Sequence, residues 1–308
     1  MEPKDFIPDD NKSNNKLEFW IRYSPIYISV VEFSMMQLAS LLYSQTRCWE
    51  ASRILDAGAG SGRPSRMFVA SYMKPGAHYY NTDFSPKMLE LFENGFNASG
   101  MCEGDTIKLN PLEKADFHTV QAYNPADKTK NIYYGYGDNL NLPFEDASFE
   151  RYISNSTLNF VDDPAKMIKE AYRVLEDGGI CGLSMVGDMT DAKMMPTIIN
   201  LMIENKIENK ATPNKINLNN KDVIRKLFED AGFKSIKIFT HKIYCCGTPE
   251  ESLNLLSNFD PISSFLRDSP EDVAKNFKDT YKAAHDELFG DNSNDLDDGE
   301  FYIMLAKK

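Results

Sequence analysis

The sequence predicts an α/β fold in which helices cover both faces of a mostly parallel β-sheet. Short apolar segments typical of strands alternate with helical segments of about 10 to 15 residues along most of the chain. Glycines follow the first predicted strand, and acidic residues stand at the ends of the first three. Ligands of such sheets bind at the carboxyl ends of the strands, so we expect the functional site there.

The predicted elements follow one another in a regular order. Residues 1–16 are rich in Asp, Asn and Lys and are expected to form a mobile arm, and residues 17–43 are expected to form a cap helix. Strands are expected at 53–57, 78–82, 132–134, 151–154, 180–186, 234–244 and 301–306. Helices are expected at 64–73, 85–95, 164–175, 191–206, 220–231 and 249–289. We interpret 17–308 as a single domain with insertions at 98–130 and 188–220.

The charge balance limits the classes of partner that the protein is expected to bind. Lys and Arg number 34 against 46 Asp and Glu, which gives a formal net charge of −12. A protein of that charge repels phosphate backbones and anionic membrane surfaces. No apolar run approaches the roughly 20 residues that are needed to span a bilayer, and the chain does not start like a secretory signal. We therefore expect a cytoplasmic protein without nucleic-acid or membrane partners, and the oligomeric state stays open.

No metal site is predicted. The five cysteines have no ligand spacing and are expected to be reduced (Cys48, Cys102, Cys181, Cys245 and Cys246). The acidic run 291–300 has Leu296 where a calcium-binding loop needs glycine, so a solvated loop is the better interpretation. His118 and His241 could act as bases, but a structural or surface role is favoured for both. We assign no catalytic residue.

The segment from Asp56 to Gly62 is the first motif that carries chemistry. Its glycines allow a sharp turn and a close ligand approach, but the dinucleotide fingerprint Gly-x-Gly-x-x-Gly fails, because its third glycine falls on Arg63 or Ser65. Asp56 at the strand end would repel a pyrophosphate and suits a cation. S-adenosylmethionine carries a sulfonium and an ammonium and no phosphate, so the loop favours that ligand over NAD.

Two further acidic residues follow the next strands. Asp83 can accept hydrogen bonds from both hydroxyls of a ribose, and Asp138 from an adenine amine beside Leu140 and Leu142. Each acid alone could instead be a helix cap or a turn residue. Three acids at the ends of three successive strands favour a ligand site.

Four runs in the expected order resemble the class I S-adenosylmethionine-dependent methyltransferases, and within them the type 11 or UbiE-like subgroup. They are Ile54-Leu-Asp-Ala-Gly-Ala-Gly-Ser-Gly62, residues 81–89, residues 137–149 and residues 170–179. The resemblance covers residues 50–187 well and the remainder more loosely. It implies a Rossmann-like, mostly parallel seven-stranded sheet with an antiparallel last strand, plus helical cap elements.

The resemblance also implies the cofactor and the residues around it. The cofactor would be S-adenosylmethionine and the product S-adenosylhomocysteine. The residues implied near the methionine part are Asp56, Ala57, Gly58, Ala59 and Gly60. Those implied near the ribose and adenine are Asp83, Phe84, Met88, Gly137, Asp138 and Asn139. Asn155 would lie beneath the sulfonium.

The acceptor is expected to be a small molecule. Residues 155–158 lack the prolines of enzymes that methylate amino groups of DNA or RNA. Residues that could line an acceptor pocket are Tyr23, Tyr27, Phe33 and Met189. Two alternatives stay open: a peptide or protein methyltransferase, and a catalytically silent regulatory partner that binds the cofactor.

Overall fold

The structure is a computed structural model of the chain. It describes residues 11–112, 120–188, 193–207, 218–245, 248–259, 261–290 and 297–308. Predictions that fall on the remaining residues, among them the start of the expected arm, His118, Met189 and most of the acidic run, lie outside the described residues.

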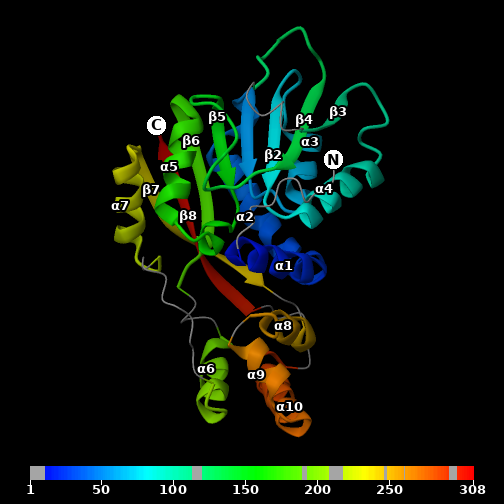
Figure 1. Cartoon of the computed structure of the whole chain (residues 1–308), viewed down its shortest axis with the longest axis vertical. Coiled ribbons are helices and arrows are strands. Elements are labelled where there is room, and N and C mark those ends of the chain that lie inside the picture. The colour runs from blue at the N-terminus through cyan, green and yellow to red at the C-terminus, as the bar shows by residue number, and fades with distance from the viewer. Residues whose placement is uncertain are drawn as a thin grey trace.

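An eight-stranded sheet forms the centre of the molecule, in the order β3-β4-β2-β1-β5-β6-β8-β7 (Figure 1). Pairing is parallel from β3 to β6, and β8 runs antiparallel to both β6 and β7. The predicted fold class is confirmed, including the antiparallel last strand. The strands are β1 (Arg53–Ala57), β2 (His78–Asp83), β3 (Ile107–Pro111), β4 (Lys130–Tyr136), β5 (Phe149–Ser154), β6 (Leu175–Val186), β7 (Lys234–Cys245) and β8 (Asp297–Lys307).

The sheet has one strand more than the seven expected. The extra strand β3 lies within the predicted insertion 98–130 and pairs in parallel with β4, with Leu109 opposite Ile132. Its sequence, Ile107-Lys-Leu-Asn-Pro111, alternates but is short and ends in proline. Proline is tolerated on an edge strand, where no further ladder bond is needed.

Helices cover both faces of the sheet because neighbouring residues of a strand point to opposite sides. Leu55 packs on one side with α5 and α7, and Ile54 packs on the other with α2, α3 and α4. The covering helices are α2 (Glu32–Gln45), α3 (Arg63–Ser71), α4 (Pro86–Ala98), α5 (Pro164–Val174) and α7 (Lys221–Ala231). Short 3-10 turns at Cys48–Glu50 and Leu158–Phe160 complete this part.

The N-terminal cap is a helix interrupted by a π-helical turn. It consists of α1 (Asn11–Ile26), the π turn Tyr27–Val31 and α2. The helix therefore begins inside the predicted arm. In the π turn the backbone N–H of Glu32 donates to the carbonyl of Tyr27, five residues earlier.

This turn changes which side chains face inward. Glu32 is 3% exposed and Phe33 is 68% exposed. The prediction that Phe33 lines a pocket is therefore wrong, because it assumed an uninterrupted α-helical period across residues 17–43. The π turn adds a residue to one turn and shifts the buried stripe of α2.

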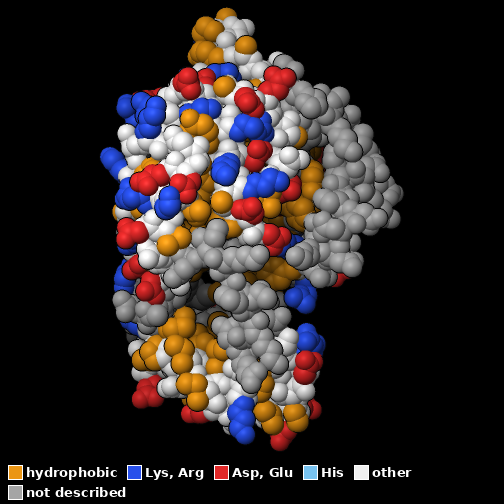
Figure 2. Space-filling view, turned by 60° about the vertical axis from the view of Figure 1, so that its left-hand side comes forward, with side chains coloured by type: hydrophobic (Ala, Val, Ile, Leu, Met, Phe, Trp, Pro, Cys, Tyr) orange, Lys and Arg blue, Asp and Glu red, His pale blue; other side chains and the backbone are white. Residues whose placement is uncertain are grey.

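A separate group of helices lies at the far end of the molecule, beyond the edge of the sheet (Figure 1). We call it the helical unit; it contains α6 (Met195–Glu204), α8 (Pro249–Leu256), α9 (Ile262–Asp268) and α10 (Glu271–Phe289). It has a small apolar core of its own, which includes Leu201, Leu253, Phe277 and Tyr281. Figure 2 shows apolar side chains on its surface as well, where Ile199 and Ile203 are exposed. The single-domain assignment stays a prediction.

The segment Lys16–Gln45 is long and apolar enough to cross a membrane by length and composition. That differs from the expectation that no such run exists. In this structure Leu38 and Leu42 of the segment are fully buried in the core beneath the sheet.

Candidate functional site

A cavity of about 360 Å³ opens at the carboxyl edge of the sheet, under the N-terminal cap. The loops after β1, β2, β4 and β5 all reach it, as expected for a parallel sheet. The predicted site residues that line it are Gly58, Gly60, Asp83, Phe84, Met88, Gly137, Asp138, Asn139, Asn155, Tyr23 and Tyr27.

Two glycines of the loop after β1 line the cavity and have backbone conformations that favour glycine. Gly58 and Gly60 have φ of 79° and 61°, in the left-handed region. A Cβ on Gly58 would lie 2.6 Å from Oγ1 of Thr157, so the loop can approach the segment after β5 only without a side chain there. The N–H of Gly60 donates to Oδ2 of Asp83 at 2.9 Å, which ties the loop to the end of β2.

Asp83 is one of the carboxylates that line the cavity. Its Oδ1 accepts from the N–H of Ser85 at 2.8 Å, and its Oδ2 accepts from Gly60. Each carboxylate oxygen has a second lone pair, so both remain able to accept from a ligand. Burial raises the pKa of Asp83 to about 6, against the lowering effect of these backbone donors.

Asp56 lies behind the glycine loop rather than in the cavity. It is 4% exposed and accepts from the hydroxyls of Tyr79 at 2.6 Å and Tyr43 at 3.1 Å. Burial raises its pKa to about 6. The structure does not place this side chain in the cavity as predicted, because Asp56 is absent from the lining and its Oδ2 binds both tyrosine hydroxyls. Ala57 and Ala59 are likewise absent from the lining.

The loop after β4 brings Asp138 and Asn139 to the cavity. Oδ1 of Asp138 accepts from the N–H of Leu140 at 2.9 Å, which fixes the turn. Phe84 and Tyr136 lie with ring centroids 5.7 Å apart beside it. Leu140 lines the cavity as expected, whereas Leu142 packs into the sheet core.

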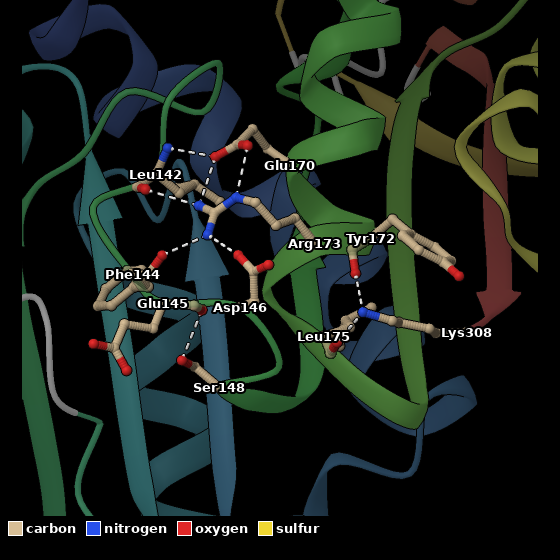
Figure 3. Close-up of polar contacts among 10 residues, drawn as sticks. All are labelled: Leu142, Phe144, Glu145, Asp146, Ser148, Glu170, Tyr172, Arg173, Leu175 and Lys308. Atoms are coloured by element: carbon tan, nitrogen blue, oxygen red, sulfur yellow. Dashed lines mark hydrogen bonds and ion pairs between the residues drawn. The ribbon is translucent and has the colours of Figure 1, made fainter.

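Two side chains of α5 hold this loop from behind (Figure 3). Arg173 donates to the carbonyls of Leu142 at 3.0 Å and Phe144 at 2.7 Å, and Glu170 accepts from the N–H of Leu142 at 2.9 Å. Arg173 also contacts Asp146 at 2.9 Å. The sequence pattern gave these residues no such role. The signal that could have revealed it is the acid–base pair three residues apart on the inner face of a helix.

Asn155 is already engaged by protein groups. Its Nδ2 donates to the carbonyl of Met35 at 2.9 Å, and its Oδ1 accepts from Oγ of Ser184 at 2.6 Å. Asn155 therefore joins the cap to the sheet while it lines the cavity.

Two buried polar atoms in the lining have no partner within the described part of the chain, namely Oδ1 of Asn139 and Oγ of Ser156. Ser156 also has a φ of 54°, which non-glycine residues rarely adopt. Buried polar groups are almost always hydrogen-bonded, so these atoms fit a polar ligand in the cavity.

The part of the cavity away from the glycine loop is aromatic. The ring centroids of Trp20 and Phe160 lie 5.2 Å apart, and those of Tyr23 and Phe259 lie 5.3 Å apart. Phe259 follows α8 in the helical unit, more than 200 residues from Tyr23 in the chain. No sequence pattern marked Trp20, Phe160 or Phe259 as site residues, because their contacts depend on tertiary structure. His241 is exposed on β7 and does not line the cavity.

Comparison with known families bears on this geometry. Residues 118–183 match the family described as "Methyltransferase domain". The chain is 35% identical over 127 residues to demethylmenaquinone methyltransferase of Staphylococcus haemolyticus, covering 36% of this chain and 53% of that protein. The predicted resemblance to the type 11 methyltransferases is confirmed.

Two other curated relatives also match parts of the chain. The ubiquinone/menaquinone biosynthesis C-methyltransferase UbiE of Desulfotalea psychrophila is 28% identical over 131 residues, covering 42% of this chain and 40% of that protein. A 2-methyl-6-phytyl-1,4-hydroquinone methyltransferase of Oryza sativa is 36% identical over 87 residues, or 28% of this chain and 25% of that protein. The chain thus spans about half or less of the length of these methyltransferases.

Solved structures support the fold of this methyltransferase-like chain. The YcgJ protein of Bacillus subtilis superposes with a TM-score of 0.52 at 15% identity, covering 88% of this chain and 98% of that one. The cyclase SpnF superposes with a TM-score of 0.51 at 17% identity, covering 89% and 81%. These likenesses concern the fold alone, since one fold hosts different reactions.

Proposed function

We propose that the protein is an S-adenosylmethionine-dependent methyltransferase that acts on a small-molecule acceptor and releases S-adenosylhomocysteine. The observation that carries the proposal is the meeting of Asp83, Asp138 and the open glycine loop in one cavity. Among the described lining residues Lys16 is the only cation, and it pairs with Asp162 at 2.7 Å. Such a lining suits a cationic ligand without phosphate better than a dinucleotide.

Each part of the lining fits one part of this cofactor. The two oxygens of Asp83 would accept from the ribose hydroxyls, and Gly58 and Gly60 leave room for the methionine part. Asp138 would accept from the adenine amine, with Phe84 and Leu140 against the ring. The unpartnered oxygen of Asn139 offers a further acceptor. Asp56 contributes a negative potential from behind the loop rather than a contact.

The bound cofactor supplies an already activated methyl group. The chain then contributes mainly proximity and orientation, holding acceptor and cofactor in one enclosed space. Tyr27 is not the base for this reaction. Burial, together with the carboxylates of Glu32 and Asp83, raises its pKa far above the ordinary range, so its hydroxyl stays protonated. It can position an acceptor by hydrogen bonding.

The aromatic part of the cavity supports a small acceptor with apolar surface. Trp20, Tyr23, Phe160 and Phe259 surround it, and the contact between Tyr23 and Phe259 joins the cap to the helical unit above it. An extended peptide is less compatible with a cavity over which the cap and the helical unit are in contact. The quinone-related names of the curated relatives agree with a small acceptor.

A cytoplasmic location is also part of the proposal.

Calorimetry with S-adenosylmethionine, S-adenosylhomocysteine and NAD tests the cofactor. We expect binding of the first two and none of NAD; NAD binding in their place would refute the proposal. Transfer of labelled methyl into a metabolite extract then tests the activity. Labelled small molecules would support an enzyme, labelled protein alone would favour the peptide alternative, and binding without transfer would favour the silent regulatory partner.

A further inference from the structure

The N-terminal cap touches the glycine loop at two points, Tyr27 and Glu32. The ring of Tyr27 lies over Gly60, with its hydroxyl 3.7 Å from the position that a Cβ of Gly60 would take. The carboxylate of Glu32 accepts a hydrogen bond from the hydroxyl of Ser61. One short stretch of the cap therefore contacts two successive residues of the loop.

The π turn explains how both side chains reach the same loop. Residues five apart on an α-helix point about 140° away from each other, since each residue turns by roughly 100°. The wider turn between Tyr27 and Glu32, closed by the bond from N–H of Glu32 to the carbonyl of Tyr27, brings the two onto one side. Such turns within helices are frequent at functional sites.

Glu32 is the buried member of a cluster of charged side chains. Oε2 of Glu32 lies 3.5 Å from Arg63, whose side chain is 48% exposed. Arg66 also faces it and donates to the carbonyl of Ser61 at 3.1 Å. Burial raises the pKa of Glu32, and the two arginines oppose that shift. Glu32 is 3% exposed, so a variant without the hydroxyl of Ser61 leaves this buried carboxylate with one hydrogen-bond donor fewer, which is costly.

The same loop lines the cavity that we assign to the cofactor. Gly60 and Tyr27 both line it, so the cap closes the space next to the glycine loop. We propose that Glu32 is a positioning residue that fastens the cap to the glycine loop, so that the cofactor leaves only after the contact between Glu32 and Ser61 opens. This inference rests on the proposed function, because the cavity must hold the cofactor.

The dissociation rate of S-adenosylhomocysteine tests it. Trp20 lines the cavity, and the chain has only one other tryptophan, so Trp49→Phe leaves a single fluorescent reporter at the site. In that background we expect Glu32→Ala and Ser61→Ala each to speed dissociation about tenfold or more in stopped-flow experiments. The double variant Glu32→Ala with Ser61→Ala should speed dissociation by less than the product of the two single effects, because the two residues share one contact.

A control variant and a second measurement separate a local effect on the cap from a global loss of stability. Glu50→Gln removes an exposed carboxylate that pairs with Arg47, and it should leave the rate unchanged. Hydrogen exchange of residues 27–45 with bound S-adenosylhomocysteine should rise in the Ser61→Ala protein, which a purely global loss of stability would not confine to the cap. If Glu32→Ala fails to fold, Ser61→Ala decides.

Two results distinguish failure of the proposed function from failure of the role of Glu32. If the wild type binds no S-adenosylhomocysteine, the proposed function fails. If the wild type binds it, and the folded variants release it within twofold of the wild-type rate, the role of Glu32 is overturned while the proposed function stands.

Discussion

Arg173 donates two hydrogen bonds to Glu170, each of 2.8 Å, in the parallel arrangement that a guanidinium and a carboxylate favour. The same two side chains bind the N–H and the carbonyl of Leu142 (Figure 3). The backbone that presents Asp138 and Asn139 to the cavity is therefore held by α5, which does not itself line the cavity.

Replacing Arg173 with lysine should loosen this loop. Lysine cannot reproduce the planar set of donors that reaches Glu170 and two carbonyls at once. We expect the affinity for S-adenosylmethionine to fall about tenfold by calorimetry, with a lower melting temperature. Arg267→Lys is the matched control, since Arg267 makes an exposed pair with Asp268. Equal affinities in the two variants would show that the loop does not depend on α5.

Asp83→Asn tests the ribose contact. Asparagine keeps the shape and one acceptor oxygen but loses the charge and the second acceptor. We expect S-adenosylmethionine to bind about 10- to 100-fold more weakly, corresponding to about 1.4 to 2.7 kcal/mol. Asp279→Asn, which removes an exposed partner of Lys275, serves as the control. Wild-type affinity of the Asp83 variant in calorimetry would refute the role of this residue.

Gly58→Ala should prevent the glycine loop from packing against the segment that follows β5. The new Cβ would meet Oγ1 of Thr157 at 2.6 Å, and the positive φ adds about 1 to 2 kcal/mol for a residue with a side chain. We expect loss of cofactor binding and a lower melting temperature. Adding Thr157→Ala should relieve the clash but not the backbone strain, and so restore only part of the stability.

Gly104→Ala is the control for that pair, because a Cβ at Gly104 meets nothing within 4 Å. Full recovery in the double variant would mean that the left-handed backbone matters little here.

Cofactor affinity should depend on pH below neutrality. The pKa of Asp83 in the free protein is about 6, and a cationic ligand with hydroxyl donors favours the ionised carboxylate. Binding therefore releases a proton, and affinity should rise as the pH increases toward about 6 and level off above it. Calorimetry between pH 5 and 8 in buffers of different ionisation enthalpy measures the affinity and the proton release. In Asp83→Asn the affinity should depend less on pH.

Folding stability should respond in the opposite sense. The pKa values of Asp56 and Asp83 are raised from 3.8 to about 6, so between these limits the native state binds more protons than the unfolded chain. The contribution of these two groups is thus most favourable below about pH 4 and is lost as the pH rises through about 6. Asp56→Asn should flatten that part of the profile in denaturant unfolding, provided that its tyrosine partners accept the amide.

Much of the sheet and of its ligand edge could be predicted from the sequence. Gly58, Asp83 and Asp138 follow three strands that pair in parallel, and parallel pairing places the ends of strands at one edge. Local signals such as Ser85 before Pro86 also hold, since Oγ of Ser85 accepts from the N–H of Met88 at 3.4 Å. Short-range patterns and strand order were sufficient for these residues.

Other features depend on contacts that no local pattern carries. The π turn before Glu32 reverses the exposure of Glu32 and Phe33, and nothing in the composition of residues 27–31 marks it. Asp56 turns away from the cavity because Tyr43 and Tyr79 lie beneath it. Phe259 reaches the cavity only through the packing of the helical unit.

The helical unit also bears on how this scaffold can change. Helices α8, α9 and α10 are inserted between β7 and β8, two strands that pair along ten residue positions from Lys234 to Cys245. The ladder between β7 and β8 uses only residues of the two strands, and the insert packs with α6 in the separate core of the helical unit. Sequence changes, or exchange of the whole insert, can therefore reshape the wall that holds Phe259 while the glycine loop and the carboxylates keep their places. The architecture separates the part that can diversify from the part that must be retained.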